Sequence, residues 1–274
     1  MAGRNGLFVP GPTNVPERVL RAMVVPMEDH RSPKFPQLTL HCLAGLKKVF
    51  KTETGTPFIF PSSGTGCWEA ALTNCLSPGD MVLIARFGQF SHLWVDMCHR
   101  LGFETQVLEC EWGEGAPVDR YRAALEADTG HKIKAVLATH NETATGVTSD
   151  VAGIRAAMDA TGHPAFLFVD AVSSLGSIDF RMDEWKVDVC VSGSQKGLML
   201  PPGIGLNAIS PKALEASKSS KFMKSFWDWQ GLLKNNADGF FPSTPPTKLL
   251  YGLEEAIKMF EEEGLDNVFK RHDP

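Results

Sequence analysis

Lys196 follows an apolar segment, residues 187–193, from which only Ser194 and Gln195 separate it. Most lysines lie on solvent-exposed surfaces, and base rates alone would place this one there. A lysine at the end of a buried strand instead points into a crevice, where desolvation lowers the pKa of its amine and favours the neutral, nucleophilic form. The Pro-Pro-Gly sequence at 201–203 then turns the chain away. The segment therefore predicts a lysine that reacts with a carbonyl carbon.

A second segment of small polar residues, Ser63, Gly64 and Thr65, lies between an apolar run at 58–60 and a segment of helical period. Free backbone N–H groups at the start of a helix, together with two hydroxyl groups, form a cradle that suits a phosphate group. The alternative interpretation is an ordinary helix cap within a glycine-rich turn.

Two further apolar runs end in polar residues. Asp170 ends the run "FLFVD". A buried carboxylate there needs a cation or several hydrogen-bond donors. The alternative interpretation is that Asp170 caps a helix. Asn141, Thr143 and Thr145 follow the run "AVLA". In an open parallel sheet, such positions face the crevice beyond the carboxyl ends of the strands, which is where ligands bind.

These groups in combination match the needs of pyridoxal phosphate. This cofactor requires a phosphate cradle, a lysine for its aldehyde, a carboxylate for its pyridine nitrogen and a flat side chain against its ring. Segment 63–65, Lys196 and Asp170 meet the first three needs, and Phe90, which follows the second apolar run, is the flat residue. The carboxylate would keep the ring nitrogen protonated, so that the ring can accept electrons. The residues therefore predict pyridoxal 5'-phosphate as the cofactor.

Short β-branched or aromatic runs alternate along the chain with segments of helical period, which is typical of an α/β fold. Seven strands are expected, at 58–60, 81–85, 105–110, 134–140, 165–170, 187–193 and 203–210. Helices are expected after the first strand and near 90–101, 118–128, 150–161, 211–217 and 246–263. We expect a mostly parallel seven-stranded sheet sandwiched by helices, with the last strand as a hairpin-like neighbour of the one before it.

The composition excludes several kinds of partner. The chain has 274 residues, of which 43% are apolar, and a net charge of -5, so it lacks the basic field that attracts nucleic acid. No apolar run approaches the roughly 20 residues of a membrane span. Six scattered cysteines without a C-x-x-C pair, and the lack of a secretory leader, favour a cytoplasmic protein with reduced thiols. His92 and His99 have no third ligand at useful spacing, so we expect no metal site.

Several motifs resemble those of one protein family. In chain order they are "PGPTNVP", "SSGTGCWEAAL", "THNETATGV", "VDAVSSLG" and "SGSQKGLMLPPG". They are similar to motifs of the class V, fold-type I aminotransferases, in the group of serine–glyoxylate and alanine–glyoxylate aminotransferases. "DHRSPKF" at 29–35 and "TPPTKLLYGLEEAI" at 244–257 resemble the serine–glyoxylate branch most closely. The resemblance implies that an amino group passes from serine, alanine or aspartate to glyoxylate, which gives glycine and a 2-oxo acid.

The resemblance also implies roles for the matching residues. Lys196 would form the Schiff base with the cofactor, and Asp170 would contact the pyridine nitrogen. Phe90 would stack on the ring, and Thr143 would face the ring oxygen. The other residues expected to bind the cofactor within the subunit are Ser63, Gly64, Thr65, Val172 and Gln195.

Three more residues match family positions at the edge of the site. Ser243 and Thr244 match residues that reach the phosphate group of the other subunit's cofactor. The resemblance therefore implies a homodimer whose active sites lie at the subunit interface. Gly11 matches a backbone position that lies over the bound substrate.

The chain departs from the family at its carboxyl end, because family members continue into a small domain with the arginine that binds the substrate carboxylate. We expect an N-terminal segment at 1–25, a cofactor-binding large domain at 26–250 and a linking helix at 251–274 toward an absent small domain. Arg31 is a remote candidate for the missing arginine. Two alternatives stay open. One is a class V lyase or desulfurase, and the latter would need a mobile nucleophilic cysteine. The other is a truncated, non-catalytic domain that retains the cofactor or dimerises.

Overall fold

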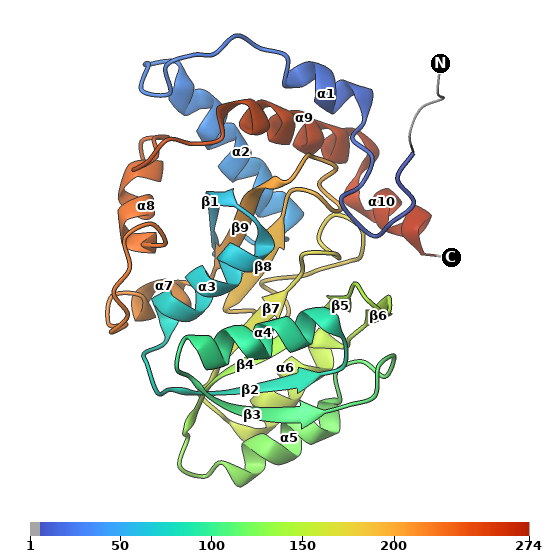
Figure 1. The fold of residues 1–274 in the computed structure, drawn as a ribbon, viewed down its shortest axis with the longest axis vertical. Helices are drawn as coiled ribbons and strands as arrows, with labels where there is room; N and C mark the ends of the chain where they lie inside the picture. Colours follow the sequence, from blue (N-terminus) through green and yellow to red (C-terminus); the bar gives the residue numbers. More distant parts are fainter. Residues whose placement is uncertain (1–5, 274) are drawn as a thin grey trace.

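A twisted seven-stranded sheet forms the centre of the molecule (Figure 1). The computed structural model describes residues 6–273. Across the sheet the strands follow the order β1-β9-β8-β7-β4-β2-β3. They are β1 (Thr56–Ser62), β2 (Met81–Arg86), β3 (Glu104–Glu109), β4 (Ile133–Thr139), β7 (Phe166–Asp170), β8 (Val189–Gly193) and β9 (Gly203–Ile209). The expected seven strands are confirmed, with boundaries that differ by one or two residues.

Most neighbouring strands of the sheet are parallel. The run from β3 through β2, β4 and β7 to β8 is parallel throughout, whereas β9 is antiparallel to both β8 and β1. The last strand is therefore the hairpin-like neighbour of β8 that the short Gly/Pro connection predicts. The mostly parallel α/β fold is confirmed.

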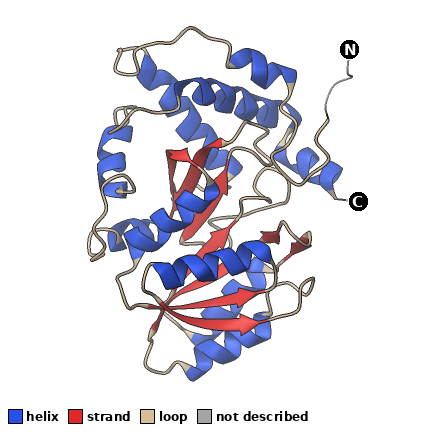
Figure 2. Cartoon of the chain, in the orientation of Figure 1, coloured by secondary structure: helices blue, strands red, loops and turns tan. Residues whose placement is uncertain are grey.

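Helices cover both faces of the sheet, and each face has its own apolar core (Figure 2). Successive strand residues point to opposite faces, so Leu83 belongs to one core and Ile84 to the other. The first core is closed by α2 (Phe35–Val49), α5 (Val118–Ala127), α6 (Val151–Thr161) and α9 (Thr247–Glu263). The second core is closed by α3 (Gly64–Cys75), α4 (Gln89–Arg100), α7 (Pro211–Ala216) and α8 (Trp229–Asn236). The layers explain why the strands read as nearly continuous apolar runs.

Polar side chains begin several of these helices. Asp150 accepts a hydrogen bond from Gly153 N–H at the start of α6, and Ser210 accepts one from Ala213 N–H at the start of α7. Each bond satisfies a backbone donor that has no partner within its own helix.

The strand register brings the predicted site residues to one edge of the sheet. Thr139 at the end of β4 pairs with Asp170 at the end of β7, and Asp170 pairs with Val191 in β8. At the other side of β8, Gly193 pairs with Gly205 of β9, and Gly203 pairs with Ser62 at the end of β1. The segments that follow β1, β4, β7 and β8 therefore emerge side by side.

Four smaller elements complete the structure. A two-stranded hairpin of β5 (Asn141–Glu142) and β6 (Val147–Thr148) follows β4. Helix α1 (Glu17–Ala22) packs on α9, and α10 (Leu265–His272) follows α9 after Gly264. The sequence patterns did not predict β5, β6 and α1, nor helices α2 and α8.

The division into 1–25, 26–250 and 251–274 stays a prediction. Its second boundary falls inside α9, and residues 1–5 and 274 lie outside the described part of the chain.

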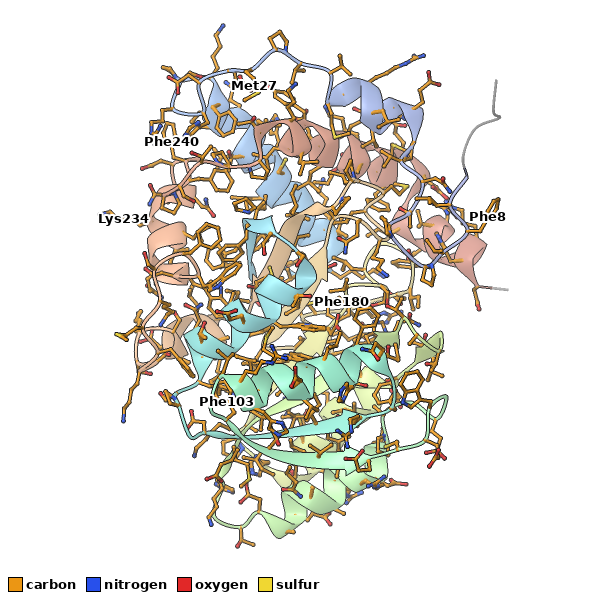
Figure 3. The ribbon with its side chains drawn as sticks, in the orientation of Figure 1. Phe8, Met27, Phe103, Phe180, Lys234 and Phe240 are labelled. Carbon is orange, nitrogen blue, oxygen red and sulfur yellow. The ribbon has the colours of Figure 1, made fainter. Side chains whose placement is uncertain are left out.

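Apolar side chains at the N-terminal segment remain exposed. Phe8 is 97% exposed, and Leu7, Val9, Val24 and Met27 are also exposed. Figure 3 shows Phe8 and Met27 at the periphery of the molecule, in contrast to the buried Phe180. Within residues 6–273, no helix has both the length and the apolarity needed to cross a membrane.

Candidate active site

Ten of the predicted site residues line one cavity of about 170 Å³ at the carboxyl edge of the sheet. They are Gly11, Ser63, Gly64, Thr65, Phe90, Thr143, Asp170, Val172, Gln195 and Lys196. Pro12 and Trp68 complete the wall. Residues from six separate parts of the chain therefore meet here. This agrees with the expectation that residues after the strands face one crevice at the carboxyl edge of the sheet.

Lys196 extends into this cavity and is only 6% exposed. Burial lowers the pKa of its amine, and the nearby Asp170 carboxylate acts in the opposite direction. Its Nζ atom lies 5.8 Å from the centre of the Phe90 ring. The chain thus holds a partly desolvated amine, with an increased neutral fraction, against an aromatic face.

Asp170 lies at the end of β7 and is 3% exposed. Burial raises the pKa of its carboxyl group to about 7; hydrogen bonding to Val172 N–H lowers the pKa, and the Glu142 carboxylate raises it further. Val172 N–H donates to Oδ1 at 2.8 Å. A carboxyl group in this setting is well suited to a cationic or N–H donor ligand that enters the cavity.

The start of α3 presents the kind of donors that the predicted anion cradle needs. Ser63 has an extended backbone before the helix, and its side chain makes no capping hydrogen bond within the described chain. The first N–H groups of a helix have no partner inside it, so those at Gly64, Thr65 and Gly66 are available to a ligand. A side chain at Gly64 would come within 2.5 Å of Val172 Cγ2, so only glycine leaves the cradle undistorted.

Gln195 and the N-terminal segment close the cavity on another side. Gln195 Oε1 is buried and has no hydrogen-bond partner among residues 6–273. Thr13 N–H donates to the Gln195 carbonyl oxygen at 3.0 Å, and the Thr13 hydroxyl donates to the Lys196 carbonyl oxygen at 3.2 Å. The N-terminal segment is thereby held across Lys196, and Gly11 lies against the lysine side chain.

The set of groups fits pyridoxal phosphate. Unpartnered N–H groups at a helix start suit its phosphate group, and a buried carboxyl group suits a protonated ring nitrogen. Gln195, whose buried side-chain oxygen has no partner among residues 6–273, also lines this cavity. These features were present in the sequence as motifs, and the structure brings them into one place.

A second, larger cavity of about 490 Å³ adjoins the first, with Lys196 and Thr143 in the walls of both. Arg271 and His272 of α10 also line it, together with Pro10, Thr13 and Asn14 of the N-terminal segment. Arg271 was not predicted as a site residue, because nothing in its local sequence distinguishes it from other basic residues near a helix end. Its guanidinium group is bonded to Glu263 at 2.6 Å, so its charge is already compensated.

Three predicted or candidate residues lie outside both cavities. Ser243 and Thr244 are exposed in the segment between α8 and α9, and their role toward another subunit stays a prediction. Arg31 is exposed as well. Neither cavity wall includes it.

The cysteines are unsuited to nucleophilic chemistry. All six are free, and only Cys110 is not fully buried. Burial raises the pKa of the Cys42, Cys67 and Cys190 thiols, which suppresses the reactive thiolate. Within the described chain, no group of three or more His, Cys, Asp or Glu residues is placed to hold a metal ion.

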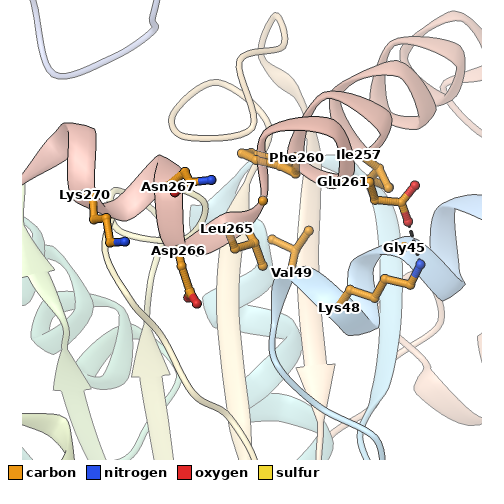
Figure 4. Close-up of a pocket in the computed structure, with 11 residues that line it drawn as sticks. Gly45, Lys48, Val49, Ile257, Phe260, Glu261, Leu265, Asp266, Asn267 and Lys270 are labelled. Carbon is orange, nitrogen blue, oxygen red and sulfur yellow. Dashed lines mark hydrogen bonds and ion pairs between the residues drawn. The ribbon is translucent and has the colours of Figure 1, made fainter.

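A separate cavity of about 560 Å³ lies between α2, α9 and α10 (Figure 4). Apolar side chains such as Val49, Ile257 and Phe260 line it, and Lys48 at its rim is paired with Glu261 at 2.6 Å. It shares no residue with the cavity around Lys196.

Known proteins resemble this chain over nearly its whole length. A family model described as "Aminotransferase class-V" matches residues 7–273. A serine–glyoxylate aminotransferase of Methylorubrum extorquens is 57% identical over 98% of this chain and 68% of the relative. An L-aspartate–glyoxylate aminotransferase of Paracoccus denitrificans is 53% identical over 99% of this chain and 69% of the relative. The chain spans about two thirds of the length of the curated relatives it matches.

Solved structures show the same fold. The crystal structure of an alanine–glyoxylate aminotransferase from Nostoc sp. superposes with a TM-score of 0.91 at 32% identity, over 99% of this chain and 72% of that one.

Proposed function

The chain belongs to the class-V aminotransferase family, and from that premise we propose that it transfers the amino group of a small amino acid to glyoxylate. The products are glycine and a 2-oxo acid. Pyridoxal phosphate is the cofactor that the family implies, and the cavity around Lys196 is its proposed site. Serine, alanine and aspartate are the proposed donors, because relatives named for each of them match this chain.

One observation carries the proposal: Lys196 and Asp170 line the same small cavity as the start of α3. Lys196 Nζ would hold the cofactor covalently through its aldehyde carbon, and the backbone N–H groups of Gly64 and Thr65 would bind its phosphate group. Phe90 would support the ring through its aromatic face.

When bound, pyridoxal phosphate supplies an electron-withdrawing ring that stabilises negative charge at the α-carbon of the substrate. Asp170 would accept a hydrogen bond from a protonated ring nitrogen, and the positive charge there would favour the ionised carboxylate. The raised pKa of Asp170 in the structure reflects burial without such a partner.

Lys196 would also move the proton. Its amine is the group in the inner cavity with a pKa lowered by burial, so a neutral fraction is available to take the proton from the substrate α-carbon. The same Nζ atom, once protonated, would deliver that proton as an acid to the former aldehyde carbon of the cofactor, which transamination requires. The outer cavity, which shares Lys196 and Thr143 with the inner one, would receive the substrate.

The proposed assembly is a cytoplasmic homodimer in which Ser243 and Thr244 contact the phosphate group of the partner's cofactor. Their exposure is consistent with this role, as are the exposed apolar side chains of Phe8 and Met27. Buried free thiols favour a reducing compartment.

The lyase and desulfurase alternatives are not favoured, because the cysteines are buried or half-buried and the near relatives are named as aminotransferases. The direct test is to load the full chain with pyridoxal phosphate, add glyoxylate with serine, alanine or aspartate, and measure glycine by mass spectrometry. We expect glycine with at least one donor, and about a 10³-fold lower rate in Lys196→Ala.

The matched control is Lys221→Ala, because Lys221 is exposed and distant in sequence from the strand ends. It should keep the wild-type rate. Pyruvate and ammonia from serine without glyoxylate would indicate a lyase instead. Cofactor binding without glycine from any donor would indicate the non-catalytic alternative.

A further inference from the structure

Glu142 is a fully buried carboxylate beside the proposed cofactor site, and its side chain is 0% exposed. It accepts hydrogen bonds from four donors. Phe90 N–H and Ser91 N–H donate to Oε2 at 3.1 and 3.0 Å, and the Ser91 hydroxyl donates to the same atom at 3.2 Å. Ala144 N–H donates to Oε1 at 3.1 Å. These donors satisfy much of the hydrogen-bonding capacity of a carboxylate that water cannot reach.

These donors belong to two different segments of the cavity wall. Phe90 and Ser91 form the first turn of α4, where a negative charge also interacts favourably with the helix dipole. Ala144 belongs to the loop between β5 and β6 and directly follows Thr143, which lines both cavities. The Glu142 carboxylate therefore ties the segment that carries Phe90 to the segment that carries Thr143.

The backbone around Glu142 is built to admit this side chain. A methyl group at Gly88 would overlap Cγ and Cδ of Glu142 and would lie 2.7 Å from Oε2. The Glu142 carbonyl oxygen accepts from Thr145 N–H at 3.2 Å and from Gly146 N–H at 2.8 Å, which closes the β5–β6 loop. Side chain and main chain of one residue thus hold the whole loop.

We propose that Glu142 is a positioning residue for the cofactor: its carboxylate fixes Phe90 and Thr143 relative to each other in the wall of the Lys196 cavity. The inference rests on the proposed function in so far as the cofactor is pyridoxal phosphate. Glu142 itself does not line the cavity, so it acts through the two residues that do.

Glu142→Gln keeps the side-chain shape but loses the charge and presents an NH₂ group to backbone donors. We expect pyridoxal phosphate to bind about tenfold more weakly, as measured by quenching of tryptophan fluorescence, since Trp68 lines the cavity. The circular dichroism signal per bound cofactor should also decrease, because the ring would adopt more than one orientation. Glu104→Gln, at an exposed position of β3, is the matched control and should change neither.

A double-mutant cycle separates positioning from general stability. If Glu142 acts through Phe90, then Glu142→Gln should weaken binding less in a Phe90→Leu background than in the wild type. Equal losses in both backgrounds, or unchanged affinity and dichroism in Glu142→Gln, would overturn the proposal.

Hydrogen exchange of the cofactor-free protein gives a readout that does not depend on the proposed function. Peptides that contain Phe90 and Ala144 should exchange faster in Glu142→Gln, whereas peptides from α3 should not change. If the wild type fails to bind pyridoxal phosphate, the proposed function is overturned. Unchanged exchange at both segments would refute the positioning role on its own.

Gly88→Ala provides a second variant in case Glu142→Gln does not fold. It retains the charge but displaces the same carboxylate, since the added methyl group overlaps its carbon atoms. It should accelerate exchange at the same two segments. Normal exchange there would contradict the proposal.

Discussion

The backbone of Gly11 lies directly against the side chain of Lys196. A methyl group at Gly11 would overlap Lys196 Cδ and come within 2.6 Å of Cε and 2.9 Å of Nζ. These two residues are far apart in the sequence, yet Thr13 bonds to the main chain of Gln195 and Lys196 and holds them together. The N-terminal segment thus sets the space in which the amine can move.

Gly11→Ala should displace the lysine, because the overlapping atoms are the flexible end of its side chain, and it should also strain the backbone, which has a φ of +159° there. We expect covalent loading with pyridoxal phosphate to slow by about tenfold or more. Gly130→Ala is the control, because a methyl group there meets only Lys132 Cγ, at 4.0 Å. Equal loading rates in the two variants would refute the close contact.

Asp170→Asn should stabilise the cofactor-free protein at neutral pH while impairing function. The folded-state pKa of Asp170 is raised to about 7, so the folded protein keeps a proton that the unfolded chain has already lost. The free energy of unfolding of the wild type therefore falls as pH rises toward 7. Above that pH, Asp170 is ionised in both states and lowers the free energy of unfolding no further. Asparagine removes the penalty and retains an acceptor for Val172 N–H.

Urea denaturation of the two cofactor-free proteins at pH 5 and pH 8 measures this effect. The advantage of Asp170→Asn should be larger at pH 8 by on the order of 2 kcal/mol. A constant difference across this range would mean that Asp170 titrates normally. The transaminase activity of the loaded variant should fall by 10²-fold or more, on the scale typical of lost electrostatic stabilisation.

Phe90→Leu should weaken pyridoxal phosphate binding by about fivefold, because the ring face would be lost while an apolar side chain remains. Phe90→Tyr keeps the ring and should keep the affinity. The dissociation constants of both variants can be measured by fluorescence quenching. If Phe90→Leu binds pyridoxal phosphate as tightly as the wild type does, Phe90 does not contact the cofactor.

Thr244→Val tests the proposed contact between subunits. Loss of the hydroxyl should weaken the binding of pyridoxal phosphate severalfold. The binding of pyridoxal, which lacks the phosphate group, should not change. The effect should appear only at protein concentrations where light scattering shows a dimer. An equal loss for both ligands, or an effect in a monomer, would argue against the assignment.

Much of the inner cavity could be predicted from the sequence, because parallel strands deliver their carboxyl ends to one edge. Asp170 ends an apolar run and Lys196 closely follows another, so their meeting follows once β7 and β8 are neighbours. The position of segment 63–65 at this edge was predictable for a similar reason, since β1 ends there as well.

Glu142 could not be identified in this way. Strands β5 and β6 have two residues each, which is too short to show an alternating pattern, and its bonds to Phe90 and Ser91 join segments about fifty positions apart. Helix α2 was missed although a signal existed: Leu38, Cys42, Leu46 and Val49 recur at helical spacing and are buried.

The most direct test of the central claim is to mix the full chain with pyridoxal phosphate, reduce it with borohydride and map the modified residue by mass spectrometry. The structure predicts a single dominant label on Lys196, whose amine is the buried one in the inner cavity. The label should be lost in Lys196→Ala and retained in Lys221→Ala. No label on Lys196, or labels spread over exposed lysines at similar levels, would contradict the assignment of this cavity as the cofactor site.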